Sequence, residues 1–149
     1  MKKFSFRYES VLKMRLDQED RIKNDLAKLI SKRQDYMDAL TALVESAGAY
    51  DQHIQKVLMD GDAQNERQQF TQGKKYYRDQ KNKLKVKIAA VDGDIRKTQA
   101  KLVEAMKERK VMDKLKEKAF QEFVDAVNEA DAKLIEEVVN YSNNKKIGE

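Results

Sequence analysis

The chain has 149 residues, of which 38% are charged and 7% aromatic, and its mean hydropathy is -0.86. A composition this polar leaves little material for a wide globular core and favours a narrow helical seam. The absence of Cys excludes disulfides and thiolate metal sites. The absence of Pro, with only five Gly, is typical of long uninterrupted helices, because Pro removes a backbone donor and clashes with the preceding turn.

Neither an export signal nor a membrane span is predicted. The first residues are basic, but the charges of Arg7 and Glu9 return before any apolar region develops. The longest apolar runs, such as residues 88–91, fall far short of the roughly 20 residues that cross a bilayer. We therefore expect any membrane contact to be peripheral or through a partner.

The first half of the chain carries a heptad seam. Its positions follow one another at alternating steps of four and three, and most are apolar among charged or amide neighbours. They are Tyr8, Leu12, Arg15, Glu19, Ile22, Leu26, Leu29, Arg33, Tyr36, Leu40, Leu43, Ala47, Tyr50, Ile54 and Val57. This pattern predicts a helix over residues 6–59.

A second seam begins at Leu84 and drifts onto a displaced apolar stripe after Phe123, as at a coiled-coil stutter. Its positions are Leu84, Ile88, Val91, Ile95, Thr98, Leu102, Ala105, Arg109, Met112, Lys116, Ala119 and Phe123. We expect one domain over residues 1–149, with a tip at 60–73, a second helix at 74–141 and a frayed tail at 142–149. Within the tip, Gly61 suits a helix C-cap and Asp62 a new N-cap.

These two seams predict an all-α fold, a long two-helix antiparallel coiled-coil hairpin. A turn centred near residue 66 would place Arg33 opposite Thr98. It would also bring Arg15 and Glu19 near the charged group Arg109, Asp113 and Lys116. The second helix would then extend past the first from about Glu129.

The usual signatures of enzymes are missing. Gly73-Lys74-Lys75 lacks the first Gly and the hydroxyl of a P-loop, and the single histidine, His53, cannot supply a His-pair metal site. A two-helix rod offers no enclosed pocket in which a carboxylate pKa would shift. The sequence therefore predicts no enzymatic activity, no metal and no cofactor.

Charge is unevenly distributed along the chain, which has a formal net charge of +5. Residues 61–90 hold eight Lys and Arg against three Asp and Glu, whereas residues 121–149 hold three against seven. The basic stretch 74–87 could bind nucleic acid through its cations and aromatics, but it lacks a known nucleic-acid-binding frame. Aromatic residues near the tip, Phe70, Tyr76 and Tyr77, could either close the coiled coil or anchor a partner.

Three segments together resemble the FliJ family of the bacterial flagellar export apparatus. The first is Phe4-x-Phe6-Arg7-Tyr8-x-x-Val11-Leu12-x-x-Arg15-x-x-x-Glu19. The second is the basic run from Lys107 to Lys118, which is similar to the family's "RK-x-LEKLKE" with Asp113 in place of Glu. The third is Lys133-Leu134-Ile135-Glu136-Glu137, which is similar to "K-x-x-DE" with Glu136 in place of Asp. Phe70 stands where the family tends to have a Phe after the tip.

The resemblance implies a coiled coil similar to the central stalk of rotary ATPases. Its implied partners are the hexameric flagellar export ATPase, into whose ring it would insert, a membrane export gate protein, and export chaperones that it would escort. It would lie in the cytoplasm, peripherally at the membrane face of the flagellar base. We expect the ATPase contact at one end, formed by Phe4, Arg7, Arg15, Glu19, Arg109, Lys110, Lys114 and Lys116. The gate or a chaperone would meet the tip at Phe70, Tyr76 and Tyr77.

Two alternatives remain open from the sequence. One is the equivalent stalk protein of a virulence type III secretion system, which shares the architecture. The other is a basic coiled-coil protein that binds nucleic acid, whose affinity would fall steeply with salt. We expect no nucleic acid partner.

Overall fold

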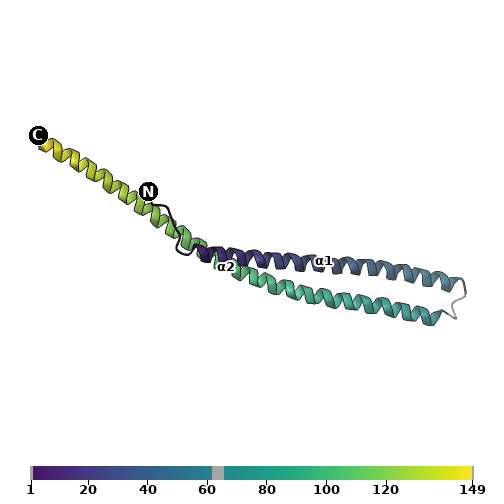
Figure 1. Ribbon diagram of the computed structural model, residues 1–149. Coiled ribbons are helices and arrows are strands. Elements are labelled where there is room, and N and C mark those ends of the chain that lie inside the picture. Colours follow the sequence, from purple (N-terminus) through teal and green to yellow (C-terminus); the bar gives the residue numbers. More distant parts are fainter. Residues whose placement is uncertain (1, 62–65, 149) are drawn as a thin grey trace. The chain divides into compact units, whose positions relative to one another are not determined.

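The computed structural model describes residues 2–61 and 66–148. Two long helices, α1 (Glu9–Met59) and α2 (Arg67–Ile147), account for nearly all of these residues and form a helical hairpin (Figure 1). None of the described residues lies in a strand. The predicted all-α hairpin fold is therefore confirmed.

Both helices contribute to two compact units. Unit 1 combines Met1–Asp20 with Glu104–Glu149, and unit 2 is the continuous stretch Arg21–Val103. In unit 2 the second part of α1 and the first part of α2 run side by side in opposite directions (Figure 1). The sequence predicted one domain over residues 1–149, and it contained no signal that separates these two units.

The heptad seam forms the core of each unit. Except for Tyr8, every predicted seam residue of both helices is buried or half-buried. Leu12 and Ala105 are the buried apolar seam residues of unit 1, and Ala47, Ile54 and Val91 are those of unit 2. No described side chain is completely buried, because each helix of a two-helix seam covers only one face of the other.

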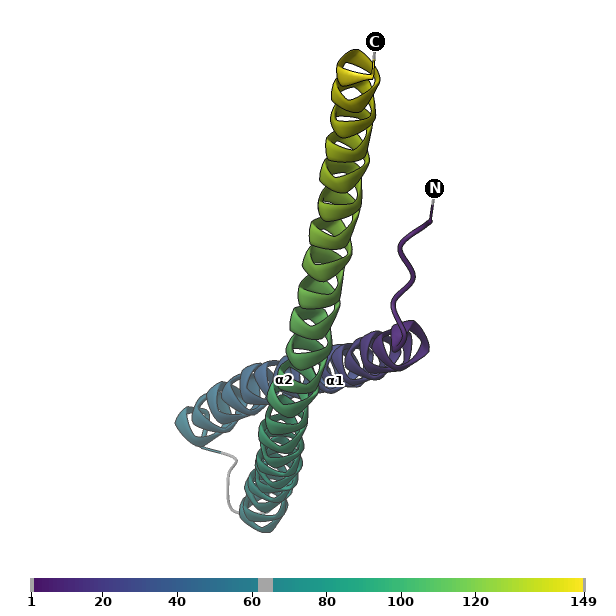
Figure 2. The ribbon, with the colours of Figure 1, turned by 90° about the vertical axis from the view of Figure 1, so that its left-hand side faces the viewer.

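The N-terminal segment ahead of α1 is irregular rather than helical (Figure 2). The helix was expected from residue 6 but begins at Glu9, whose amide donates to the Phe6 carbonyl over 3.2 Å. Phe4 packs on Phe120 and Phe123 of α2, while Phe6 is buried beside Tyr8. These ring contacts are made from irregular chain ahead of α1, which begins later than expected.

α2 begins at Arg67, earlier than the expected residue 74, and ends at Ile147 rather than at 141. The seam continues backward from Leu84 through Tyr77 to the buried Phe70 in heptad steps, so Gly73 lies inside the helix rather than in a tip. At the far end Lys145 and Lys146 occupy the last turn, where cations interact favourably with the helix dipole.

Gly61 lies just after the last residue of α1, Met59, and has a φ of 83°. This left-handed conformation is the one that favours Gly after a helix C-terminus, so the predicted C-cap is confirmed. The predicted N-cap at Asp62 lies outside the described residues. With α1 ending at Met59 and α2 starting at Arg67, the turn is centred before residue 66.

The earlier turn changes which residues face each other. Arg33 donates to Asp92 over 2.6 Å, whereas Thr98 hydrogen-bonds to the Asp94 carbonyl of its own helix. The expected Arg33 and Thr98 layer is therefore wrong. The turn is centred about half a heptad earlier than expected, so each residue of α1 faces a residue of α2 that is about one heptad earlier in the chain. A shift of one whole heptad keeps both seams facing each other.

Candidate functional site

A buried charged cluster joins the two helices of unit 1. Glu19 is 3% exposed although it is ionisable. Arg109 donates from Nε to Glu19 and from Nη1 to Asp113 over 2.7 Å. The hydrogen bond to Glu19, followed by that to Asp113, raises the pKa of Arg109 above its ordinary value. The guanidinium thus joins Glu19 of α1 to Arg109 of α2 and also contacts Asp113 on its own helix.

Two further ion pairs flank this cluster in unit 1. Arg15 pairs with Glu108 at 2.7 Å, and Lys116 pairs with Glu9 at 3.0 Å. The predicted meeting of Glu19, Arg109 and Asp113 is therefore observed, whereas Arg15 and Lys116 take other partners. The sequence indicated which charges face the seam, but their exact pairing depends on the position of the turn.

Three of the predicted contact residues remain on the surface of unit 1. Lys110 and Lys114 are exposed, and no carboxylate among the described residues pairs with either. They lie four residues apart on α2 and therefore share one helix face. Arg7 is also exposed and sits over the Tyr8 ring, 5.5 Å from its centroid.

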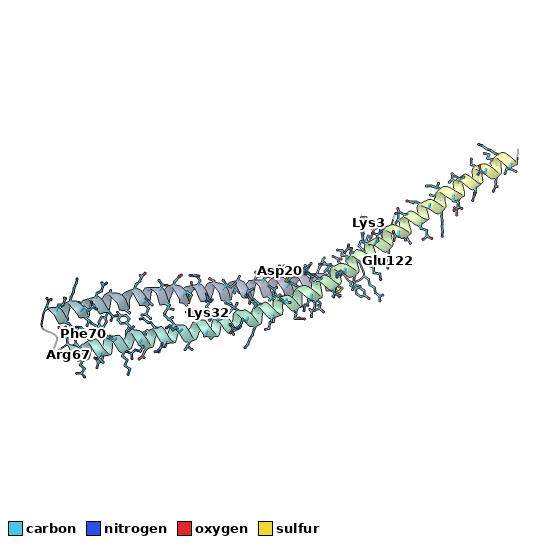
Figure 3. All side chains as sticks on the ribbon, turned by 180° about the vertical axis from the view of Figure 1, so that it is seen from behind. Lys3, Asp20, Lys32, Arg67, Phe70 and Glu122 are labelled. Atoms are coloured by element: carbon cyan, nitrogen blue, oxygen red, sulfur yellow. The ribbon has the colours of Figure 1, made fainter. Side chains whose placement is uncertain are left out.

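Phe4 anchors the N-terminal segment to α2. Its ring centroid lies 5.2 Å from that of Phe120, edge to face, and 5.6 Å from that of Phe123. Figure 3 places Lys3 and Glu122 at the same level of unit 1, in agreement with these contacts. Phe4 thus supports the fold through an aromatic cluster with the predicted seam residue Phe123 and with Phe120, which lies outside the predicted seam.

Beyond this cluster, α2 is uncovered within unit 1. Every described residue from 125 to 148 is exposed, including Leu134, Ile135 and Val138. This uncovered extension of α2 was expected from about Glu129. It begins earlier because, in the observed register, α2 reaches the start of α1 at an earlier residue. The third family-like segment, residues 133–137, lies on this uncovered helix.

The predicted tip aromatics of unit 2 differ in exposure. Phe70 is buried near the start of α2, beside Arg67 in Figure 3. The Tyr50 ring lies 6.3 Å from that of Phe70 and 5.4 Å from that of Tyr77. Tyr76 packs on Tyr77 at 5.5 Å but is 57% exposed. Phe70 and Tyr77 therefore close the coiled coil, and Tyr76 is the member available to a partner.

Gly73 allows this aromatic closure. A Cβ on Gly73 would lie 2.1 Å from Tyr50 Oη, and the Tyr50 hydroxyl donates to the Gln69 carbonyl over 3.3 Å. The sequence analysis treated Gly73 as part of the tip and placed Tyr50 only in the seam. A Gly that follows Phe70 by three residues on a helical stripe is the signal that could have found this contact.

The described residues contain no group of three or more His, Cys, Asp or Glu able to hold a metal ion. None of the helices, where described, is long and apolar enough to cross a membrane. His53 is exposed, with its ring edge-on to Phe70 at 6.4 Å.

Comparison with known proteins gives one result. The model of the flagellar FliJ protein family matches residues 4–146, nearly the whole chain. No curated protein and no solved structure matches the chain.

Proposed function

The chain belongs to the flagellar FliJ family, which makes it a non-enzymatic component of the flagellar protein export apparatus, and we propose that it acts there as a stalk and adaptor. In this role it inserts into the ring of the export ATPase and promotes its activity. It also links the ring to the membrane export gate and escorts export chaperones. Its place is then the cytoplasm, at the membrane face of the flagellar base.

The proposed ATPase contact is the surface of unit 1 around Lys110, Lys114 and Arg7. The observation that carries it is the exposed pair Lys110 and Lys114, which lacks a carboxylate partner among the described residues. Arg109 and Glu19 hold the helix beneath this surface in place. Charges arranged on a rigid support set specificity and encounter rate with a partner of opposite charge.

A matched pair of charge reversals tests this contact. Lys110→Glu with Lys114→Glu changes the exposed cations of unit 1 without touching the Glu19 cluster. Lys97→Glu with Lys101→Glu makes the same charge change, also four residues apart on α2, but in unit 2. We expect the first variant to lose capture of the export ATPase from a lysate of the source cell and the second to retain it. Equal capture by both variants would refute the assignment.

The proposed gate or chaperone contact is the aromatic tip of unit 2. Tyr76 is its accessible member, Tyr77 is half-buried, and Phe70 is buried against Tyr50. Exposed aromatic side chains on a rigid base are typical hot spots of protein interfaces. Tyr77, which packs on Tyr76, then holds it in position.

Replacing Tyr76 separates binding from folding. Because Tyr76 is 57% exposed, Tyr76→Ser should leave the melting temperature nearly unchanged while weakening binding to the purified gate domain or to a chaperone about tenfold. Phe70→Ala removes a buried ring and should lower the melting temperature as well. Unchanged binding by Tyr76→Ser to both partners would show that the contact lies elsewhere.

A further inference from the structure

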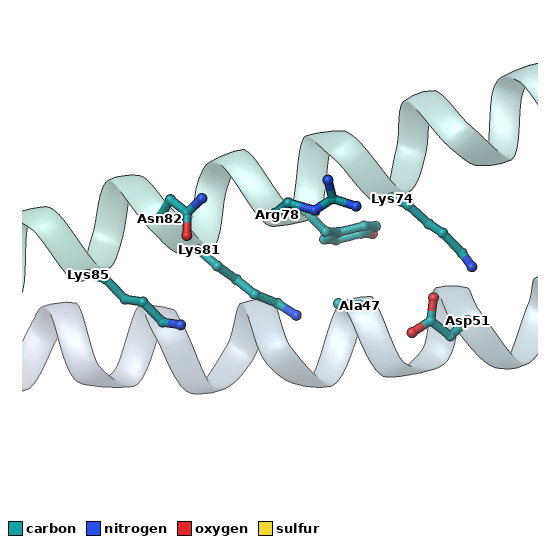
Figure 4. Close-up of a pocket in the computed structure, with 8 residues that line it drawn as sticks. Ala47, Asp51, Lys74, Arg78, Lys81, Asn82 and Lys85 are labelled. Carbon is teal, nitrogen blue, oxygen red and sulfur yellow. The ribbon is translucent and has the colours of Figure 1, made fainter.

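A cationic groove runs along one side of unit 2. It has a volume of about 300 Å³, and its wall on α2 holds Lys74, Arg78, Lys81 and Lys85, while Ala47 and Asp51 line it from α1 (Figure 4). The four cations follow one another at steps of four, three and four, which places them on one face of the helix. In Figure 4 the amines of Lys74, Lys81 and Lys85 point toward α1.

None of these cations forms an ion pair within the part of the chain that the structure describes. Elsewhere the helices join their charges across the seam, as in Arg33 with Asp92 and Lys116 with Glu9. No such ion pair involves a cation of the groove, and Asp51 is the only carboxylate that lines it. Several unpaired cations along one groove make it attractive to an anionic ligand.

The α1 side of the groove is lined by Ala47 and Asp51, and Ala47 forms its apolar floor together with Tyr77 of α2. Gly48 is not one of the lining residues; it is exposed, follows Ala47 and lies three residues before Asp51, so it forms the flank of α1 beside this wall. A Cβ on Gly48 would meet nothing within 4 Å, so packing inside the chain does not require Gly there. Gly is less favourable than Ala in a helix interior, and here it leaves the flank beside the groove without a side chain.

We propose that this groove binds an acidic helical segment of a partner protein. The cations lie at helical spacing, so carboxylates at the same spacing on a docked helix meet them one by one. The floor of Ala47 and Tyr77 takes an apolar side chain between those carboxylates. A nucleic acid strand would use the cations but has no aliphatic side chain to place on the floor of Ala47 and Tyr77.

The proposal adds a ligand chemistry to the tip contact proposed above, because Tyr77 belongs to both surfaces. It does not depend on the ATPase contact in unit 1. Binding of an acidic peptide can fail while capture of the export ATPase survives, and the reverse is also possible. The two ideas can therefore be refuted separately.

The test uses the full-length chain and a fluorescein-labelled helical peptide. This peptide carries Glu at steps of four, three and four with Leu between them, and a control peptide has Gln in place of each Glu. Fluorescence anisotropy is recorded in low and moderate salt. We expect the Glu peptide to bind about tenfold more tightly than the Gln peptide, with affinity that falls as salt rises.

Three variants distinguish the groove from charge in general. Lys81→Glu with Lys85→Glu reverses two groove cations, and Lys75→Glu with Lys83→Glu reverses two exposed cations on other faces of the same stretch of α2. Gly48→Leu fills the α1 flank without changing charge. We expect the first and third variants to weaken peptide binding about tenfold and the second to weaken it less than about threefold. Circular dichroism checks that all three remain folded.

Specific outcomes would overturn the proposal. Equal losses in the two double variants would mean non-specific attraction. Full binding by Gly48→Leu would mean that no helix enters the groove. Tighter binding of a single-stranded oligonucleotide than of the Glu peptide, unaffected by Gly48→Leu, would make the ligand a nucleic acid. Self-association lost in Lys81→Glu with Lys85→Glu, seen by sedimentation velocity, would make the occupant a second copy of this chain.

Discussion

Gly73 and Tyr50 show how one small residue sets the packing near the turn. The missing side chain of Gly73 leaves room for the Tyr50 ring, which in turn contacts Tyr77 and Phe70. Gly93, also in α2, leaves no room that a neighbour fills. The atom nearest to a Cβ on Gly93 would be Arg96 Nη2, at 4.0 Å. The two glycines therefore respond differently to the same substitution.

Gly73→Ala should destabilise the protein although Ala is the better helix former. Ala gains about 1 kcal/mol of helix propensity, but displacing a packed tyrosine ring costs about 1–3 kcal/mol. Gly93→Ala keeps the gain without the clash and should raise the melting temperature. Thermal unfolding followed by circular dichroism measures both. A higher melting temperature for Gly73→Ala would contradict the close contact with Tyr50.

The Glu19 and Arg109 pair makes a second prediction at this scale. Removing Glu19 leaves Arg109 with only the exposed Asp113 as a partner and takes away a buried contact between the helices, so Glu19→Ala should lower the free energy of unfolding. Replacing both residues by Leu should recover most of this loss. Chemical denaturation measures each variant. If the double variant were no more stable than Glu19→Ala, the cost would lie in lost packing rather than in the unpaired charge.

The two parts of α2 have different surroundings. Its seam side is covered in both units up to Phe123, whereas residues 125–148 are exposed throughout. Burial in the seam is what stabilises a helix of a coiled coil, because propensity alone leaves isolated helices marginal in water. The uncovered part therefore contributes little to the stability of the rest.

Truncation tests this statement directly. A chain that ends at Ala126 should unfold within about 3 °C of the full chain, because no side-chain contact of the seam is lost. Its helical circular dichroism signal should fall in proportion to the residues removed. A much lower melting temperature would mean that residues 127–147 pack on another part of the molecule.

Periodicity was enough to predict which residues of each helix face the other. The seam from Leu12 to Val57 and from Leu84 to Phe123 is buried or half-buried as expected, because heptad spacing itself determines one face of a helix. The register across the seam was not predictable in the same way. Any shift by a whole heptad keeps the pattern, and only the turn after Met59 decides between the alternatives.

For the whole molecule, the sequence predicted the hairpin and the family. It also indicated that Glu19, Arg109 and Asp113 would meet, but not that Arg15 and Lys116 would pair with Glu108 and Glu9 instead. It could not reveal the groove beside Lys81, because that groove depends on which residues of α1 lie opposite the basic stretch. The helical spacing of the groove cations could be read from the sequence, but the residues of α1 that lie across from them, Ala47 and Asp51, could not.

The central claim is that unit 1 meets the export ATPase and the aromatic tip of unit 2 meets the gate or a chaperone. The natural absence of Cys allows single cysteines to be placed without background. Lys114→Cys and Tyr76→Cys, each carrying a photoactivatable crosslinker, can be introduced into motile cells in which crosslinked partners are identified by mass spectrometry. The account predicts that position 114 crosslinks to the export ATPase and position 76 to the gate or a chaperone. Crosslinking of position 76 to the ATPase, with none from position 114, would contradict it.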